Sequence, residues 1–270
     1  MMRDKSNLCS GILGAVYVEG LDQSICPICY LVSTGEAKYA ENLLYENVLD
    51  PDVRVRFLES LGLCTNHAWL LLETAERIHD RLGVSILYLD ALKKLRDSLE
   101  EIIDSGGDPS YKCFMCKYSK DAEDRYTTLY RECLNPEDYR RSKAIFCLKH
   151  LRSIIRYWEE SKKKQILEVH REKLKEVEEN LDRYISKHSY ENKEPITREE
   201  AEAVERAIVL LKGLKIYTVT AERKPGEEKE IIENKRVNSF ASMFKKVLRP
   251  SSDKSSNDPC KNQSSNVDNL

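Results

Sequence analysis

The chain has 270 residues, of which 41% are hydrophobic and 33% charged, and its formal net charge is −2. This balance lacks the basic excess typical of phosphate binding, so nucleic acid is not expected as a partner. No apolar run approaches the ~20 residues of a membrane span, and residues 12–18 lack the features of a signal peptide. The composition predicts a cytoplasmic protein with one large core or two small ones, with a weak thermophile-like bias.

The first predicted helix begins at a CxxC motif. The sequence "CPIC" (26–29) precedes apolar residues that recur on one helical face, and the helix is expected to stop at the breaker Asp50-Pro51. A short helix over residues 52–60 follows, and Gly62 is expected to close it as a C-cap.

A CxxH motif opens the next predicted helix. In "GLCTNHAWLLL" (62–72) Cys64 and His67 lie three residues apart, which places them on one face. The helix is expected over residues 69–82, with Thr65 or Asn66 as its N-cap. A further helix over residues 84–103 carries apolar residues at 4-3-4-3 spacing, and "DSGGDPS" (104–110) is a linker.

The whole arrangement then repeats. "TLYRECLNPEDYRR" (128–141) aligns with "LLYENVLDPDVRVR" (43–56), and Tyr39 and Tyr126 each follow the first cysteine of their copy by thirteen residues. The offset between copies falls from 87 at the CxxC to 83 at the CxxH, which two small deletions explain. The chain is therefore expected to contain two helical repeats, residues 1–104 and 111–220.

One long charged helix is expected behind the second CxxH, over residues 151–187. Side chains at heptad spacing form a seam along this helix, and the seam predicts packing against residues 84–103 of the same chain. A homodimeric coiled coil is the alternative, so the protein is expected to be a monomer or homodimer. Thr197 and Glu200 predict the capping box of a closing helix that ends at Gly213. The seam consists of Leu167, His170, Leu174, Val177, Leu181, Tyr184 and His188.

The last part of the chain, residues 221–270, has the composition of a flexible tail. Within it, "KRVNSFASMFKKVLR" (235–249) has five Lys or Arg, no acid and apolar residues at helical spacing. A basic amphipathic helix can contact an anionic membrane surface or a partner's groove, but an idle tail is the favoured interpretation because so short a helix is marginal alone.

The repeated cysteines and histidines predict two metal sites. Three thiolates and an imidazole are a typical donor set for structural Zn²⁺, and helix N-termini favour the thiolate form. Each repeat is expected to close its own site, because an ancestral single unit would have done so; a crossed pairing of CxxC and CxxH is the disfavoured alternative. The expected ligands are Cys26, Cys29, Cys64 and His67 in one site, and Cys113, Cys116, Cys147 and His150 in the other.

Other interpretations of the cysteines are weaker. Iron–sulfur clusters also use cysteine ligands, with histidine as an occasional replacement, and form the main alternative cofactor. A thioredoxin-type dithiol would need a βαβ pattern that the sequence lacks. In a reducing compartment the nine cysteines indicate ligands rather than disulfides. Of the remaining three, Cys133 aligns with Val48 and is expected to face the core, Cys9 has no counterpart, and Cys260 lies in the tail.

At these motifs the chain resembles an uncharacterised prokaryotic family, a domain of unknown function with duplicated CPxC and GxCxxH helical repeats. The resemblance rests on "CPICY", "LDPDVR", "GLCTNHAWLLL", "LGVSILYLDAL", the second CxxC and CxxH, and "RAIVLLKG", and covers residues 20–213. The second copy departs from the pattern, because "CFMC" lacks the proline and "AIFCLKH" the glycine. The resemblance implies an all-α metal-binding architecture and supplies no reaction.

Taken together, the sequence predicts a non-enzymatic helical scaffold, held by two metal ions, that binds an unidentified protein partner. The alternative is an iron–sulfur protein for electron transfer or redox sensing. No phosphate-binding loop or catalytic triad order is present in the sequence, and four protein ligands would leave no open position on either metal.

Overall fold

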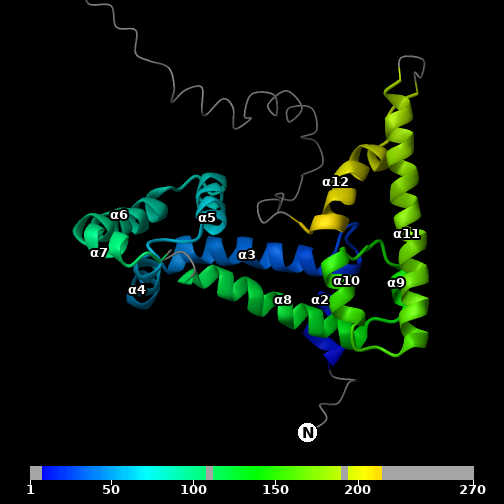
Figure 1. The fold of residues 1–270 in the computed structure, drawn as a ribbon, viewed down its shortest axis with the longest axis horizontal. Helices are drawn as coiled ribbons and strands as arrows, with labels where there is room; N and C mark the ends of the chain where they lie inside the picture. Colours follow the sequence, from blue (N-terminus) through cyan, green and yellow to red (C-terminus); the bar gives the residue numbers. More distant parts are fainter. Residues whose placement is uncertain (1–7, 108–111, 190–193, 215–270) are drawn as a thin grey trace, which may run out of the picture. The chain divides into compact units, whose positions relative to one another are not determined.

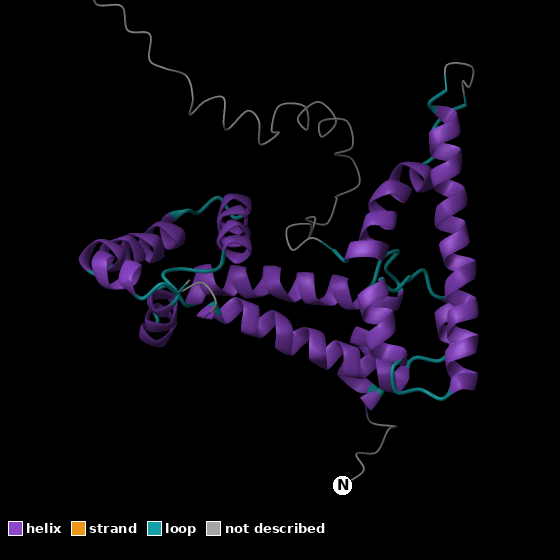
Figure 2. Cartoon of the chain, in the orientation of Figure 1, coloured by secondary structure: helices purple, strands orange, loops and turns teal. Residues whose placement is uncertain are grey.

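The computed structural model describes residues 8–107, 112–189 and 194–214. Within these ranges the chain is helical and forms no strand (Figure 2), which confirms the predicted all-α class. Residues 1–219 belong to one structural unit, and Thr220–Leu270 form a second that lies wholly outside the described residues. The predicted basic helix at 235–249 therefore also lies outside them.

From the CxxC onward the helices of the first repeat follow the predicted order, with two changes of boundary, but the helix over Gly11–Leu21 was not predicted. The CxxH helix starts earlier than expected, because Cys64 itself is the N-cap, and it ends before His79, whose φ of 57° is left-handed. The expected helix over residues 84–103 breaks at Ser98 into two. The elements are α2 (Gly11–Leu21), α3 (Pro27–Glu46), α4 (Pro51–Glu59), α5 (Thr65–Arg77), α6 (Leu82–Asp97) and α7 (Leu99–Asp104).

The second repeat differs from the prediction in its longest helix. The expected helix over residues 151–187 is interrupted at Trp158, whose indole N–H donates to the backbone oxygen of Arg131 at 2.9 Å and fixes a turn there. The capping box of Thr197 and Glu200 is present as predicted. The elements are α8 (Phe114–Cys133), α9 (Pro136–Arg141), α10 (Leu148–Ile155), α11 (Glu160–Lys187) and α12 (Arg198–Lys212).

Helices α3 and α8, the first helix after each CxxC, lie side by side and antiparallel (Figure 1). Tyr39, late in α3, packs its ring 4.7 Å from that of Tyr118, early in α8. A Cβ on Gly35 would lie 2.8 Å from the Tyr118 hydroxyl, so glycine is what permits this close approach. The start of each helix therefore lies near the end of the other.

The antiparallel pair separates two hydrophobic cores. One surrounds the start of α3 and includes Ile28, Tyr130 and Phe146, and the other surrounds the start of α8 and includes Phe57, Leu71 and Met115. Because each core takes side chains from both repeats, the repeats fold onto each other.

The charged helix α11 packs on α12 and α9. The prediction that its seam would pack on residues 84–103 was wrong, because α6 lies at the core around the start of α8. His170 of the seam is buried, and its Nδ1 atom shares a hydrogen bond of 2.7 Å with the Tyr139 hydroxyl, so it is a packing residue.

Candidate metal centres

All eight predicted ligands gather in two clusters of the described chain, each with its four donor atoms within 4.8 Å of one another. Site A consists of Cys26, Cys29, Cys147 and His150. Site B consists of Cys64, His67, Cys113 and Cys116.

The pairing of the motifs is crossed, so the prediction that each repeat closes its own site was wrong. Each site takes its CxxC from one repeat and its CxxH from the other. The reason is the antiparallel packing of α3 and α8, which carries the CxxC of one copy to the CxxH of the other. Duplication therefore does not require each repeat to close its own site, because two copies that pack against each other can close two shared sites equally well.

Both sites lie where helices begin. The first cysteine of each motif is the N-cap of its helix: Cys26 for α3, Cys64 for α5, Cys113 for α8 and Cys147 for α10. The second ligand of each motif then falls at the third helical residue. Two helix N-termini thus converge on each site, and their positive dipole ends stabilise thiolates there.

Site A is compact and buried. The His150 Nδ1 atom lies 3.3 Å from Cys26 Sγ, 3.4 Å from Cys29 Sγ and 3.2 Å from Cys147 Sγ. Cys29 Sγ and Cys147 Sγ are 3.8 Å apart. Cys26 and Cys147 are fully buried, and Cys29 is half-buried.

Site B has the same layout but a more open edge. His67 Nδ1 lies 3.1 Å from Cys64 Sγ, 3.6 Å from Cys113 Sγ and 3.4 Å from Cys116 Sγ. Cys64 Sγ and Cys116 Sγ are 3.4 Å apart. His67 and Cys113 are buried, Cys64 is half-buried and Cys116 is exposed.

A glutamate supports the histidine of each site. Glu36 Oε1 lies 3.4 Å from Nε2 of His67, and Glu123 Oε1 lies 2.8 Å from Nε2 of His150. With Nδ1 facing the sulfurs, Nε2–H donates to the carboxylate, an arrangement that fixes the ring and its tautomer in many metal sites. Sequence reasoning missed both glutamates, although each stands ten residues after the first cysteine of its CxxC.

For His67 and Cys113 of site B, hydrogen bonds oppose the effect of burial on the pKa. Burial lowers the pKa of His67, but hydrogen bonds to Cys113 and Glu36 outweigh burial and raise it to about 10. Burial raises the pKa of Cys113, but its hydrogen bond with His67 and others bring it down to about 6. Near neutral pH the metal-free site thus holds a thiolate beside a protonated imidazole, and a metal must displace that proton.

Site A follows the same pattern. Burial lowers the pKa of His150, but hydrogen bonds to Cys147 and Cys29 raise it to about 10. Hydrogen bonds from Cys26 and Cys29 hold the pKa of the Cys147 thiol far below its ordinary value. Metal binding at this site also has to release protons.

Cys9 and Cys133 form a disulfide, with their Cα atoms 5.6 Å apart. The expectation that the cysteines form no disulfide was therefore wrong, whereas Cys133 does pack against the core around the start of α3, as predicted. Cys133 is the last residue of α8, where the segment before α2 reaches it, a proximity that no local pattern reveals. Cys260 lies outside the described residues.

Among the described residues no helix combines the length and apolarity needed to cross a bilayer.

The comparisons with known proteins agree with this picture of two related halves. The model of a family of unknown function, DUF6062, matches residues 19–110 and 93–217. The chain is 25% identical over 183 residues to the "Uncharacterized 23.9 kDa protein in xynA 3'region" of Caldicellulosiruptor sp. (strain Rt8B.4), an alignment that covers 65% of this chain and 88% of that protein. No solved structure matches the chain. The expected resemblance to an uncharacterised family is confirmed.

Proposed function

The chain belongs to the family of unknown function DUF6062, and from this premise we propose that it is a non-enzymatic scaffold in which two zinc ions join the repeats and present a surface to a protein partner. The observation that carries the proposal is the crossed pairing of two complete Cys₃His donor sets. Each ion would bind α3 or α8 of one repeat to the CxxH helix of the other.

The spacing of the donor atoms supports zinc. A tetrahedral Zn²⁺ with Zn–S bonds of about 2.3 Å and Zn–N bonds of about 2.0 Å separates sulfurs by about 3.8 Å and sulfur from nitrogen by about 3.5 Å. The sulfur–nitrogen distances in site A are 3.2 to 3.4 Å, and Cys29 and Cys147 have their sulfurs 3.8 Å apart. The residues present thus fit one ion of this size.

An iron–sulfur cluster is the second candidate for these sites. A cluster places several iron and sulfide atoms between its ligands, whereas all four donors here lie within 4.8 Å of one another. This spacing favours a single ion. Purified anaerobically, a zinc protein is colourless, while a cluster would give a brown protein that absorbs visible light.

Elemental analysis of paired variants tests both metal content and pairing. The unmodified chain is expected to hold two metals. Cys29→Ser/Cys147→Ser removes two ligands of site A and should leave one metal, whereas the matched control Cys29→Ser/Cys64→Ser damages both sites and should leave none. No metal in the first variant and one metal in the second would instead show that each repeat closes its own site. A folded parent without metal would contradict the proposed function.

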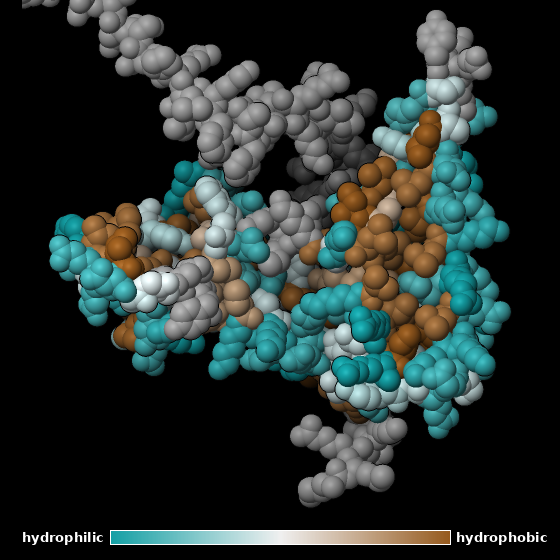
Figure 3. All heavy atoms as spheres, viewed as in Figure 1, coloured by the Kyte–Doolittle hydropathy of each residue, from teal (hydrophilic) through white to brown (hydrophobic). Residues whose placement is uncertain are grey.

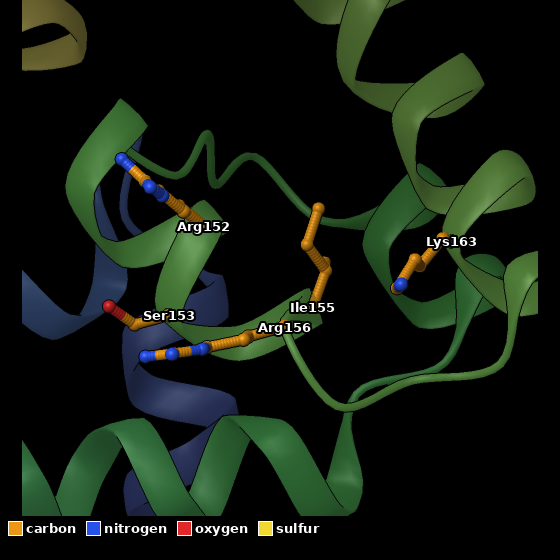
Figure 4. A pocket seen from close by; sticks show the side chains of 5 residues that line it. All are labelled: Arg152, Ser153, Ile155, Arg156 and Lys163. Atoms are coloured by element: carbon orange, nitrogen blue, oxygen red, sulfur yellow. The ribbon is translucent and has the colours of Figure 1, made fainter.

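A basic groove supports a partner with acidic groups. It lies between α10 and the start of α11, and its charged lining residues are Arg152, Arg156 and Lys163 (Figure 4). Apolar side chains gather over α10, α11 and α12 (Figure 3). Leu148 of α10 and Leu211 of α12 are 63% and 67% exposed. Apolar area beside positive charge is typical of protein-binding surfaces, although Lys163 here also pairs with Glu160 at 2.7 Å.

The partner proposal is tested by charge reversal. Crosslinking in the native cell should join a carboxylate-rich partner to the wild-type protein, and Arg152→Glu/Arg156→Glu should abolish that product. Lys175→Glu, on the exposed side of α11, is the control. A product that persists in the groove variant would rule out this surface.

An enzymatic role is not part of the proposal, because four protein ligands complete each coordination shell. We also propose a cytoplasmic location, on the ground that the six cluster cysteines are free to bind metal; the Cys9–Cys133 disulfide is unusual for a reducing compartment.

A further inference from the structure

Sites A and B have the same donor set but differ in access. In site A, Cys26 and Cys147 are each 0% exposed. In site B, Cys116 is exposed and Cys64 is half-buried, while Cys113 and His67 lie beneath them, each 2% exposed. A solute therefore meets an exposed and a half-buried cysteine at site B, whereas at site A only Cys29 is half-buried and the other two cysteines lie in the core.

The two accessible sulfurs of site B are also next to each other. Cys64 Sγ and Cys116 Sγ are separated by 3.4 Å and come from different repeats, at the starts of α5 and α8. The corresponding pair in site A, Cys29 and Cys147, is 3.8 Å apart, and one member is fully buried. Only site B thus combines an exposed thiolate with a neighbouring sulfur that could resolve its oxidation.

We propose that site B is an oxidant-sensitive metal site, at which a peroxide converts Cys64 and Cys116 to a disulfide and releases the metal, while site A keeps its own. This proposal rests on the proposed function, because it requires that both sites bind metal. Exposure governs which cysteines oxidise, and metal-bound thiolates react without first losing a proton.

The reaction balances in two steps. The Cys116 thiolate attacks one peroxide oxygen, so that an S–O bond forms, the O–O bond breaks and the departing hydroxide takes a proton to become water. The Cys64 thiolate then attacks the Cys116 sulfur, so that the S–S bond forms, the S–O bond breaks and a second protonated hydroxide leaves as water. The two thiolates lose two electrons in total, and the peroxide gains them.

Metal release follows because the oxidation removes two of the four ligands. Cys113 and His67 alone cannot complete a tetrahedral shell. The new disulfide would link the starts of α5 and α8, which the metal had joined, so the two repeats stay connected at this end. Reduction and added zinc should restore the site.

The test starts with full-length protein shown by elemental analysis to carry two metals. Hydrogen peroxide is added, released metal is followed with a chromogenic chelator, and the cysteines are mapped by mass spectrometry. We expect half of the metal to leave, together with a peptide pair linked through Cys64 and Cys116. Dithiothreitol and zinc should return the metal content to its starting value.

Two variants serve as matched controls. Cys64→Ser/Cys116→Ser retains only site A and should keep its metal under the same treatment, whereas Cys29→Ser/Cys147→Ser retains only site B and should lose it. Equal release from both variants, release without the mapped linkage, or no release at all would overturn the proposal. Absence of metal before treatment is a different result, which contradicts the proposed function instead.

Discussion

At the level of single residues, the glutamates behind the histidines are the least expected part of the sites. The CxxC and CxxH motifs could be recognised from sequence because their ligands lie within one helical turn. Glu36 and Glu123 could not, since each meets its histidine only after two helices have packed, and glutamate on a charged helix looks like a surface residue. Their shared position after each CxxC is a signal that only knowledge of the duplication would reveal.

The first prediction concerns these carboxylates. Glu36→Gln should weaken metal binding at site B by about 10- to 100-fold, because a neutral amide orients and polarises His67 less strongly. Competition with a zinc-binding dye measures the change. Glu46→Gln, exposed on the same helix, should bind as the parent does. An unchanged metal affinity in Glu36→Gln would show that Glu36 only packs against the His67 ring and does not tune its metal binding.

A second residue-scale prediction follows from His170. Burial and the charge of Lys173 lower the pKa of His170 to about 4 from 6.5. The unfolded chain therefore binds more protons between these values, and stability should fall as the pH drops through this window. The loss from this group is about 2 kcal/mol between about pH 7 and about pH 5.

Urea unfolding at several pH values measures this effect. His170→Gln cannot protonate, so the difference between the parent and the variant isolates His170 from the titrating clusters, which both proteins share. If the two unfolding free energies run parallel across the window, the assignment to His170 is incorrect.

At the level of helices, local sequence signals predicted most helices, but not the helix boundaries that depend on contacts with other helices. Breakers such as Pro51 and the Thr197 capping box act within a few residues, and both are in place. The turn at Trp158 depends on a hydrogen bond to Arg131 in another helix, which no local pattern contains. The crossed pairing of the sites has the same origin, because it depends on the direction in which α3 and α8 pack.

Packing between helices gives the third prediction. Gly20 of α2 lies against Tyr130 of α8, and a Cβ added at Gly20 would clash with the Tyr130 hydroxyl oxygen. Tyr130 is fully buried, and its hydroxyl donates a hydrogen bond to the backbone oxygen of Tyr17 at 3.0 Å, so the side chain cannot move aside. Gly20→Ala should therefore lower stability by about 1–3 kcal/mol, despite alanine's better helix propensity.

Thermal unfolding checks this value against Gly107→Ala, where a Cβ meets nothing closer than 4.0 Å. The control should melt within a degree or so of the parent. An equally stable Gly20→Ala protein would mean that α2 can shift away from α8.

For the whole described unit, the crossed sites make the two repeats dependent on each other. Loss of one metal is expected to loosen segments in both repeats, because site A joins the start of α3 to α10 and site B joins the start of α8 to α5. This differs from the expectation for closed repeats, in which only one half would loosen.

Hydrogen exchange tests this fourth prediction. In Cys29→Ser/Cys147→Ser, amide protection should fall at the beginning of α3 and along α10, and remain at α5 and the beginning of α8. Exchange that rises throughout one repeat and nowhere in the other would refute the shared arrangement.

The antiparallel pairing of α3 and α8 has a further consequence for the continuity of the chain. Each site takes ligands from both repeats, so the sites hold the repeats together even where the chain between them is cut. With the Cys9–Cys133 disulfide reduced, a chain nicked once between residues 104 and 112 should behave as a split protein whose fragments reassociate through zinc. Chelation would then turn a folding equilibrium within one molecule into the dissociation of two, with a midpoint that depends on protein concentration.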